Sequence, residues 1–166
     1  MAPVRRFLSL PWREKVLLFK VVLLVLATRV AITLLPFQVV TRSLSRLARP
    51  KNGPQTNPHH ADIDRIVWFT EATGRRLRGI ATCLTQALTA YVLLGRRGYE
   101  TNLRIGVTRD DAGQFVGHAW LEKGDRIVIG QRGVNLERYT SFPAFKGLEP
   151  LSSPTPVRPA TRESKR

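Results

Sequence analysis

The stretch that decides the fold runs from residue 83 to residue 130: CLTQALTAYVLLGRRGYETNLRIGVTRDDAGQFVGHAWLEKGDRIVIG. Its first sixteen residues place apolar side chains at i, i+3 and i+4, which predicts a helix over 83–98 that ends at Gly98. Three runs typical of β-strands follow, at 100–108, 114–122 and 126–130, separated by turn residues. A helix followed by a strand meander predicts an α+β domain.

Further helices are expected upstream of this stretch. Their predicted ranges are 11–35, capped by Ser9, then 36–48, and then 60–74, ending at Gly74. We expect an N-terminal helical extension over 1–48, a linker over 49–58 and a core domain over 59–149. The prolines and polar residues of 150–166 predict a disordered basic tail.

The most hydrophobic run, 11–35, is open to three interpretations: a buried or partner-facing helix, a membrane anchor, or a signal peptide. Lys20 and Arg29 interrupt it, and each costs about 2.5–3.5 kcal/mol near the centre of a bilayer. The eight residues between them are too few to span one. This favours the first interpretation, with residues 16–41 as a partner-docking segment of a cytoplasmic protein.

Charge and cysteine content narrow the classes of partner and site. The 166 residues include 27 Lys and Arg but 12 Asp and Glu, for a formal charge of +15. No zinc finger, basic region preceding heptads, or RNA-binding aromatic strand accompanies this charge. A solvated basic surface is therefore favoured over an acidic partner, and over nucleic acid. The single cysteine, Cys83, excludes an intramolecular disulfide and argues against a Cys-based zinc site, so no metal or cofactor is expected.

Cys83 and His118 are the candidate catalytic pair. A cysteine at the start of a helix lies where backbone N–H groups and the helix dipole favour the nucleophilic thiolate. Alone, such a residue is more often a small buried hydrophobe. His118, however, lies inside an apolar strand, and a helix N-terminus next to such a strand brings an imidazole within reach of a thiol. The backbone N–H of Cys83 is the natural oxyanion donor, with a second donor from the loop that holds Gly79 and Thr82.

Several short motifs together resemble a known family. They are Cys83-Leu84, then LLGRRG at 93–98, LRIGV at 103–107, GHAWLE at 117–122 and VIG at 128–130. This combination resembles the B2-type leader peptidases of lasso-peptide maturation, which are papain-like cysteine proteases with a transglutaminase-like core. The resemblance covers roughly residues 60–140, and LLPF at 34–37 adds to it. It implies an α+β transglutaminase-like core behind the N-terminal helical extension.

The resemblance also assigns roles to single residues. Cys83 matches the nucleophile and His118 the general base, and Trp120 matches the motif as a wall of the site. The family often carries an Asp about a dozen residues past the histidine, but no carboxylate stands there in this sequence. Gln131 is the candidate that orients the imidazole instead, and Asp125, in the expected hairpin turn, is the alternative third residue.

The implied activity is cysteine-type endopeptidase cleavage of a lasso-peptide precursor between leader and core. The implied partners are that precursor, a B1-type leader-binding protein and an asparagine-synthetase-like cyclase. Two alternatives stay open on the sequence. One is a non-catalytic transglutaminase-like scaffold, which the missing acid supports. The other is a membrane-associated basic binding protein, which the charge and the apolar run support.

Overall fold

The computed structural model describes residues 11–50, 60–131 and 133–142. It contains the helices α2 (Trp12–Leu34), α3 (Phe37–Ala48), α4 (His60–Arg76) and α5 (Cys83–Gly95), the strands β1 (Asn102–Arg109), β2 (Phe115–Lys123), β3 (Arg126–Ile129) and β4 (Thr140–Ser141), and the short 3₁₀ helix η1 (Leu136–Arg138). The expected cap Ser9, most of the expected linker and the expected tail lie outside the described residues.

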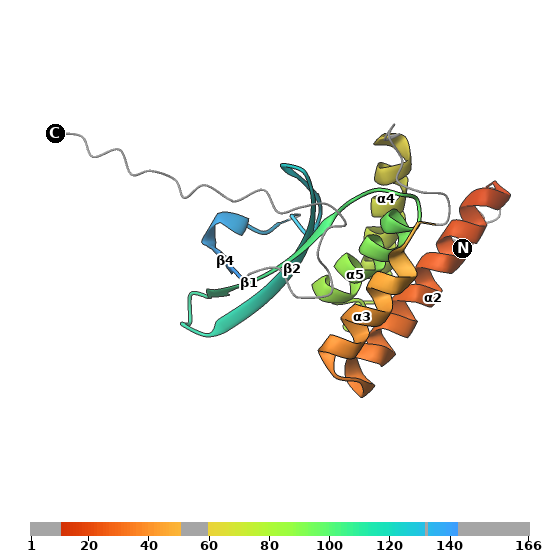
Figure 1. Cartoon of the computed structure of the whole chain (residues 1–166). Helices are drawn as coiled ribbons and strands as arrows, with labels where there is room; N and C mark the ends of the chain where they lie inside the picture. The colour runs from red at the N-terminus through yellow and green to blue at the C-terminus, as the bar shows by residue number, and fades with distance from the viewer. Residues whose placement is uncertain (1–10, 51–59, 132, 143–166) are drawn as a thin grey trace, which may run out of the picture.

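The chain folds into two layers, with the helices on one side of an antiparallel sheet (Figure 1). The strand order is β3-β2-β1-β4, so β3 and β4 are the edges of the described sheet. The prediction of an α+β fold is confirmed. Strand β4 and η1 were not expected, because two strand residues and a single 3₁₀ turn are too short for a periodic pattern.

Helix α5 is the centre of the core. Nine of its residues, between Thr85 and Leu94, are buried, because α2, α3 and α4 pack around it on one side and the sheet lies on the other. One apolar cluster therefore joins the N-terminal helices to the sheet, through side chains such as Val25, Leu44, Leu88 and Leu121.

Two expected helix ends differ in the structure, and both differences involve glycine. Helix α4 continues through Gly74 to Arg76, so Gly74 is not a C-cap. A Cβ on Gly74 would lie 2.4 Å from the side chain of Gln86, so this glycine permits close approach of α4 and α5. Helix α5 ends at Gly95, and Gly98 follows in the left-handed conformation with φ of 82°.

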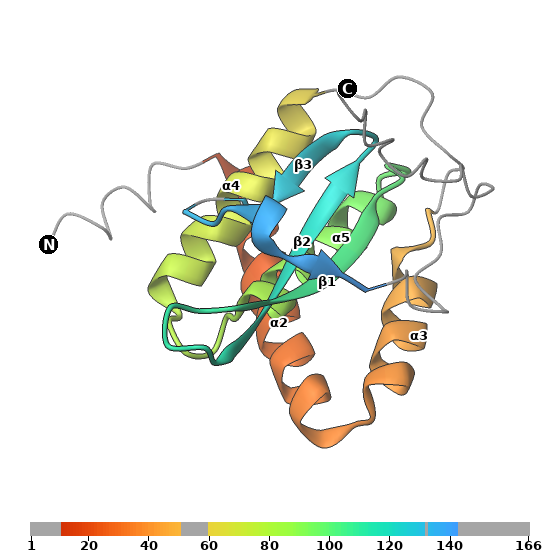
Figure 2. The same ribbon diagram turned by 90° about the vertical axis from the view of Figure 1, so that its left-hand side faces the viewer.

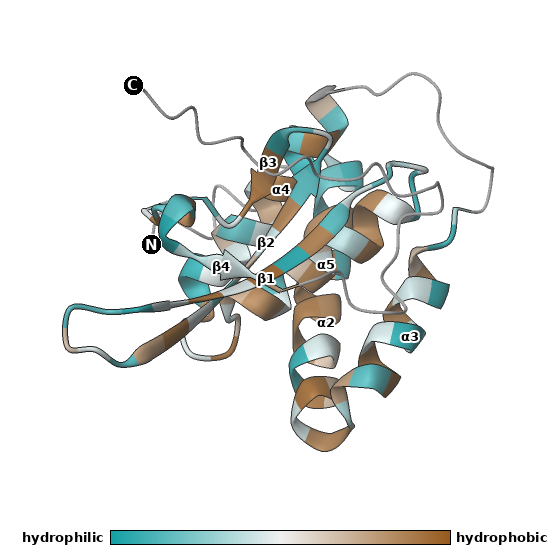
Figure 3. Cartoon of the chain, turned by 60° about the vertical axis from the view of Figure 1, so that its left-hand side comes forward, coloured by the Kyte–Doolittle hydropathy of each residue, from teal (hydrophilic) through white to brown (hydrophobic). Residues whose placement is uncertain are grey.

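Helices α2 and α3 form a hairpin that carries apolar residues at its tip (Figure 3). One face of α2 packs on the core through Leu17, Val21 and Val25, while Phe19 and Leu23 on the other face are 68% and 56% exposed. On α3, Val40 and Leu44 are buried, whereas Val39 and Leu47 are exposed. By length and composition alone, α2 is long and apolar enough to cross a membrane.

Candidate active site

Cys83 is the first residue of α5, as the sequence predicted. Thr82 is the N-cap, and its hydroxyl accepts a hydrogen bond from the Thr85 N–H at 3.4 Å. This cap satisfies one N–H of the first turn, and the other N–H groups at the start of α5 have no carbonyl partner within the helix. Cys83 is partly buried, so its side chain is largely removed from solvent but still has a face that a substrate can reach.

His118 reaches the thiol because β3 ends early. Strand β3 pairs with β2 only as far as Ile129 opposite Leu121, which leaves the next part of β2 without a neighbour on that side. The Phe142 N–H donates to the Ile105 carbonyl, so the main chain of Ile105 faces β4. Its partner Ala119 must then direct its own N–H away from β1, into the space where α5 begins.

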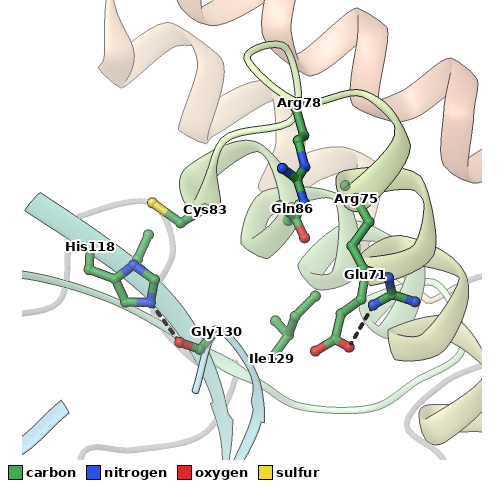
Figure 4. A pocket seen from close by; sticks show the side chains of 10 residues that line it. Glu71, Arg75, Arg78, Cys83, Gln86, His118, Ile129 and Gly130 are labelled. Carbon is green, nitrogen blue, oxygen red and sulfur yellow. Dashed lines mark hydrogen bonds and ion pairs between the residues drawn. The ribbon is translucent and has the colours of Figure 1, made fainter. Parts of the chain in front are cut away.

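The Cys83 thiol lies beside the imidazole of His118, and Figure 4 shows the sulfur on the Nδ1 side of the ring. Burial alone would raise the pKa of the Cys83 thiol, but the hydrogen bond and charge of His118 and hydrogen bonds with the backbone of Ala119 and Leu84 outweigh it, so the pKa is lowered. The pKa of His118 is raised, chiefly by its hydrogen bond with Cys83 and despite burial. Both shifts favour a thiolate next to an imidazolium.

The third member of the site is a main-chain group. His118 Nε2 lies 2.6 Å from the carbonyl oxygen of Gly130. A carbonyl only accepts, so Nε2 carries the proton and Nδ1 is left to face Cys83. Gly130 has φ of 100°, a conformation that favours glycine, and this conformation turns the chain just past β3.

The two side chains expected as third residue do not contact the imidazole. Gln131 follows the Gly130 carbonyl, but its side chain is exposed and forms no hydrogen bond within the described residues. Asp125 lies in the β2–β3 turn, beyond the pair Lys123–Arg126. At about 3.4 Å per residue, that turn is roughly 17 Å along β2 from His118. The group that contacts the imidazole is therefore the main-chain carbonyl of Gly130, and not the side chain of Gln131.

Trp120 supports the histidine and does not line the pocket. It is buried, and its ring is stacked with the imidazole at 6.3 Å between centroids and 17° between planes. Its Nε1–H donates to Glu122 Oε1 at 2.7 Å, and Arg104 Nε donates to Glu122 Oε2 at 3.0 Å. Tyr139 completes this cluster, 5.7 Å from the imidazole. The HAWLE motif therefore encodes the imidazole together with its packing and hydrogen-bonded support.

A pocket of about 310 Å³ opens beside Cys83 and His118 (Figure 4). Three side chains that were not expected at the site, Glu71, Arg75 and Gln86, lie in its wall together with Arg78. Gln86 lies three residues after Cys83, so helical spacing places it on the same face of α5, a signal that could have found it. Its Nε2 donates to the Ala81 carbonyl at 2.9 Å. Glu71 and Arg75 come from α4, which the sequence alone does not bring to the cysteine, and Arg78 comes from the loop just before Cys83.

The site has the parts that acyl transfer through a thiol requires. They are a nucleophile of lowered pKa, a base with an orienting acceptor, and the N–H of Cys83, which has no helical carbonyl to bond and is available as an oxyanion donor. Among the described residues, no three His, Cys, Asp or Glu side chains form a group that could hold a metal ion.

Comparison with known proteins agrees with this geometry. The family described as Transglutaminase-like superfamily matches residues 23–143, more than half of the chain. No curated protein and no solved structure gave a significant match. The match begins within α2, so it includes most of the N-terminal helices as well as the sheet. The chain belongs to the transglutaminase-like superfamily, which includes cysteine peptidases.

Proposed function

We propose that this protein is a cysteine endopeptidase that removes the leader from a lasso-peptide precursor. The observation that carries the enzymatic part is the placement of Cys83 and His118 side by side in the wall of one pocket, with the pKa of the thiol lowered and that of the imidazole raised. The choice of substrate rests on the resemblance of the motifs LLGRRG, LRIGV and GHAWLE to leader peptidases of that pathway.

The residues fit a two-step hydrolysis. The Cys83 thiolate attacks the carbonyl carbon at the leader–core junction, and the oxygen takes up negative charge next to the N–H at the start of α5. His118 then gives its proton to the leaving amine, so the core departs with a free N-terminus and the leader remains as a thioester on Cys83. Water attacks the thioester, His118 takes a proton from it, and the thiolate and a leader carboxylate are released.

The Gly130 carbonyl can orient the imidazole in place of the acidic side chain that this sequence lacks. A missing acid would favour a non-catalytic scaffold if nothing else held the imidazole. Here a 2.6 Å hydrogen bond to a backbone carbonyl fixes the tautomer that the reaction needs. The arrangement is therefore better suited to a working base than to an inactive relative.

Two partners belong to the proposal. A leader-binding protein would deliver the precursor, and an asparagine-synthetase-like cyclase would use the freed N-terminus of the core. The exposed apolar face of α2, which includes Phe19 and Leu23, is the surface we assign to such a partner. The reaction itself would take place in the cytoplasm.

The test is cleavage of a candidate precursor by the purified protein, with and without a candidate leader-binding protein, read by mass spectrometry. We expect one cut, at the leader–core junction, and, when the reaction is quenched early with acid, a species with the mass of leader plus enzyme less one water, which is the thioester on Cys83. Cys83→Ala is the matched control, since it removes the nucleophile alone. Cleavage by the Cys83→Ala protein, or no cleavage by the native chain with its partner, would contradict the proposal.

A further inference from the structure

A second hollow adjoins the pocket of Cys83 and runs along β3. Its volume is about 340 Å³, and its lining shares Glu71, Ile129 and Gly130 with the first pocket. The remaining lining residues are Ile127, Val128 and Gln131. The two hollows together form a groove between α4 and β3 that leads to the candidate nucleophile; Figure 2 shows β3 at the edge of the sheet beside α4.

This groove is lined by the main chain of β3. Five consecutive residues, 127–131, contact the same hollow. The first three of them, Ile127 to Ile129, belong to β3. Side chains of a strand alternate between the two faces of a sheet, so three in a row line one hollow where it follows the backbone edge. Within the described residues, β3 has a partner strand on one side only, which leaves its outer N–H and C=O groups unpaired.

The hairpin geometry identifies one residue with outward main-chain groups. Lys123 and Arg126 pair across a two-residue turn, so the main chain of Arg126 faces β2. Directions alternate along an antiparallel strand, and the N–H and C=O of Ile127 therefore face the groove. The register then shifts between Leu121 and Glu122, a bulge that re-aims the last part of β3 toward the site.

We propose that the polypeptide substrate binds as an added β-strand on the outer edge of β3, with its main chain paired to that of Ile127 and its scissile bond at Cys83. This inference rests on the proposed peptidase function and names how the substrate is held. Continuity of the groove with the Cys83 pocket identifies the occupant as the substrate. At about 3.3 Å per residue, the five residues of the groove correspond to four or five residues of an extended peptide. Main-chain pairing supplies the affinity in this mode of recognition.

Because the recognition is through the main chain, alanine peptides suffice as probes. Each probe carries an α-ketoamide, whose carbonyl adds reversibly to a thiol, with one to five alanines on either side of it. Binding to the full-length protein is measured as protection of Cys83 from alkylation by iodoacetamide. We expect the longest peptides to bind at least tenfold more tightly than the single-residue ketoamide. N-methylation of one amide at a time should weaken binding about tenfold at every second position and leave the positions between unaffected.

Two proline variants test the location. Ile127→Pro removes the outward N–H and places the ring in the groove, and it should abolish the gain with peptide length. Ser141→Pro is the matched control at the opposite edge: the Phe142 N–H bonds Ile105 in β1, so the N–H of Ser141 faces away from the sheet. The Ser141→Pro protein should therefore bind longer peptides more tightly to the same extent as the native protein does. The native rate of alkylation by iodoacetamide identifies variants in which the site is intact.

The outcomes separate this inference from the proposed function. Loss of the length gain in Ile127→Pro with an intact site, together with alternation in the N-methyl series, supports strand addition. Two results on the native protein would overturn it: affinity that does not rise with peptide length, or equal effects of N-methylation at consecutive positions. The N-methyl series tests the proposal even when Ile127→Pro does not fold. Cleavage of the precursor without any such alternation would leave the peptidase in place and remove the strand site.

Discussion

The imidazole of His118 donates from Nε2 to the carbonyl oxygen of Gly130, 2.6 Å away, so a backbone group holds the position that an Asp or Asn side chain holds in related triads. A carbonyl has no charge, so it orients the ring without adding a negative charge next to the imidazolium. The pKa of His118 is raised first by its hydrogen bond with Cys83, and the hydrogen bond with Gly130 adds to this.

Replacement of Gly130 should therefore damage catalysis more than either polar side chain nearby. A Cβ at Gly130 would lie 2.7 Å from Trp120 Cβ and 2.9 Å from the Ala119 carbonyl oxygen, and φ of 100° is strained for alanine. A displacement near 1 Å costs roughly 10²-fold in rate, which is the loss of kcat/KM expected for Gly130→Ala.

Gln131→Ala and Asp125→Asn are the controls for this test. The sequence alone ranked Gln131→Ala as the more damaging of the two, but its side chain is exposed and Asp125 lies in a distant turn. Both variants should process the precursor near the native rate. A large loss in either one, with Gly130→Ala nearly native, would return the orienting role to that side chain.

Removal of the nucleophile should leave the fold unchanged. Cys83→Ala replaces a partly buried thiol by a methyl group, and such a change should alter the free energy of unfolding by less than about 1.5 kcal/mol. Leader removal should be lost completely. Thermal unfolding and mass spectrometry of the same preparation check the two halves of this prediction.

The reactivity of Cys83 should depend on pH through His118. The lowered pKa of Cys83 means that alkylation by iodoacetamide should rise at a pH below the ordinary thiol value of 9.0. His118→Ala removes the hydrogen bond and the charge but keeps much of the burial, so the midpoint should move upward and alkylation at pH 7 should slow. Identical pH profiles for the two proteins would mean that the imidazole does not activate the thiol.

Peptidase activity should follow a bell-shaped pH profile. The acid limb reports formation of the thiolate, and the basic limb reports loss of the His118 proton that the leaving amine requires. Since the pKa of His118 lies above its ordinary value of 6.5, the basic limb should lie above that value as well. Initial rates of precursor cleavage from pH 5 to pH 10 check this.

Glu122 should stabilise the fold around His118, because it accepts hydrogen bonds from two neighbouring side chains. Its two oxygens accept from Trp120 Nε1 at 2.7 Å and from Arg104 Nε at 3.0 Å, so Glu122→Ala leaves two partly buried donors without this acceptor. The expected loss is about 1–3 kcal/mol of stability. Asp64→Ala is the control, because its pair with Arg126 is 59% exposed on both sides and such pairs contribute about 0–1 kcal/mol. The free energies of unfolding of both variants, measured by denaturant unfolding, check this prediction.

The exposed face of α2 distinguishes a partner surface from a membrane anchor. Leu23→Glu lies on the exposed face and should leave the fold intact while improving the solubility of the isolated chain, because large apolar patches drive association. Val25→Glu, two residues on and fully buried, should unfold the protein. After an alkaline carbonate wash we expect the native protein in the supernatant. Retention in the lipid pellet, with release by Lys20→Glu, would favour the anchor.

Helices of several turns, and strands long enough to show alternating apolar residues, were predictable from the sequence. Hydrophobic periodicity is a local property of the chain. The pattern from Cys83 to Gly95 and the three runs from Asn102 to Ile129 all appear as expected elements. The proximity of Cys83 and His118 was predictable for a related reason: each is unusual at its place, a cysteine at a helix start and a histidine within an apolar strand.

The ends of elements and the third member of the site depended on contacts between distant segments. Gly74 was predicted to end a helix, but the requirement there is space for the side chain of Gln86 in a neighbouring helix. The Gly130 carbonyl has no signature in the sequence, since every residue carries one. It becomes the partner of His118 only because β3 ends beside β2 at Ile129 and the chain then turns through a positive φ, which brings this one oxygen to the ring.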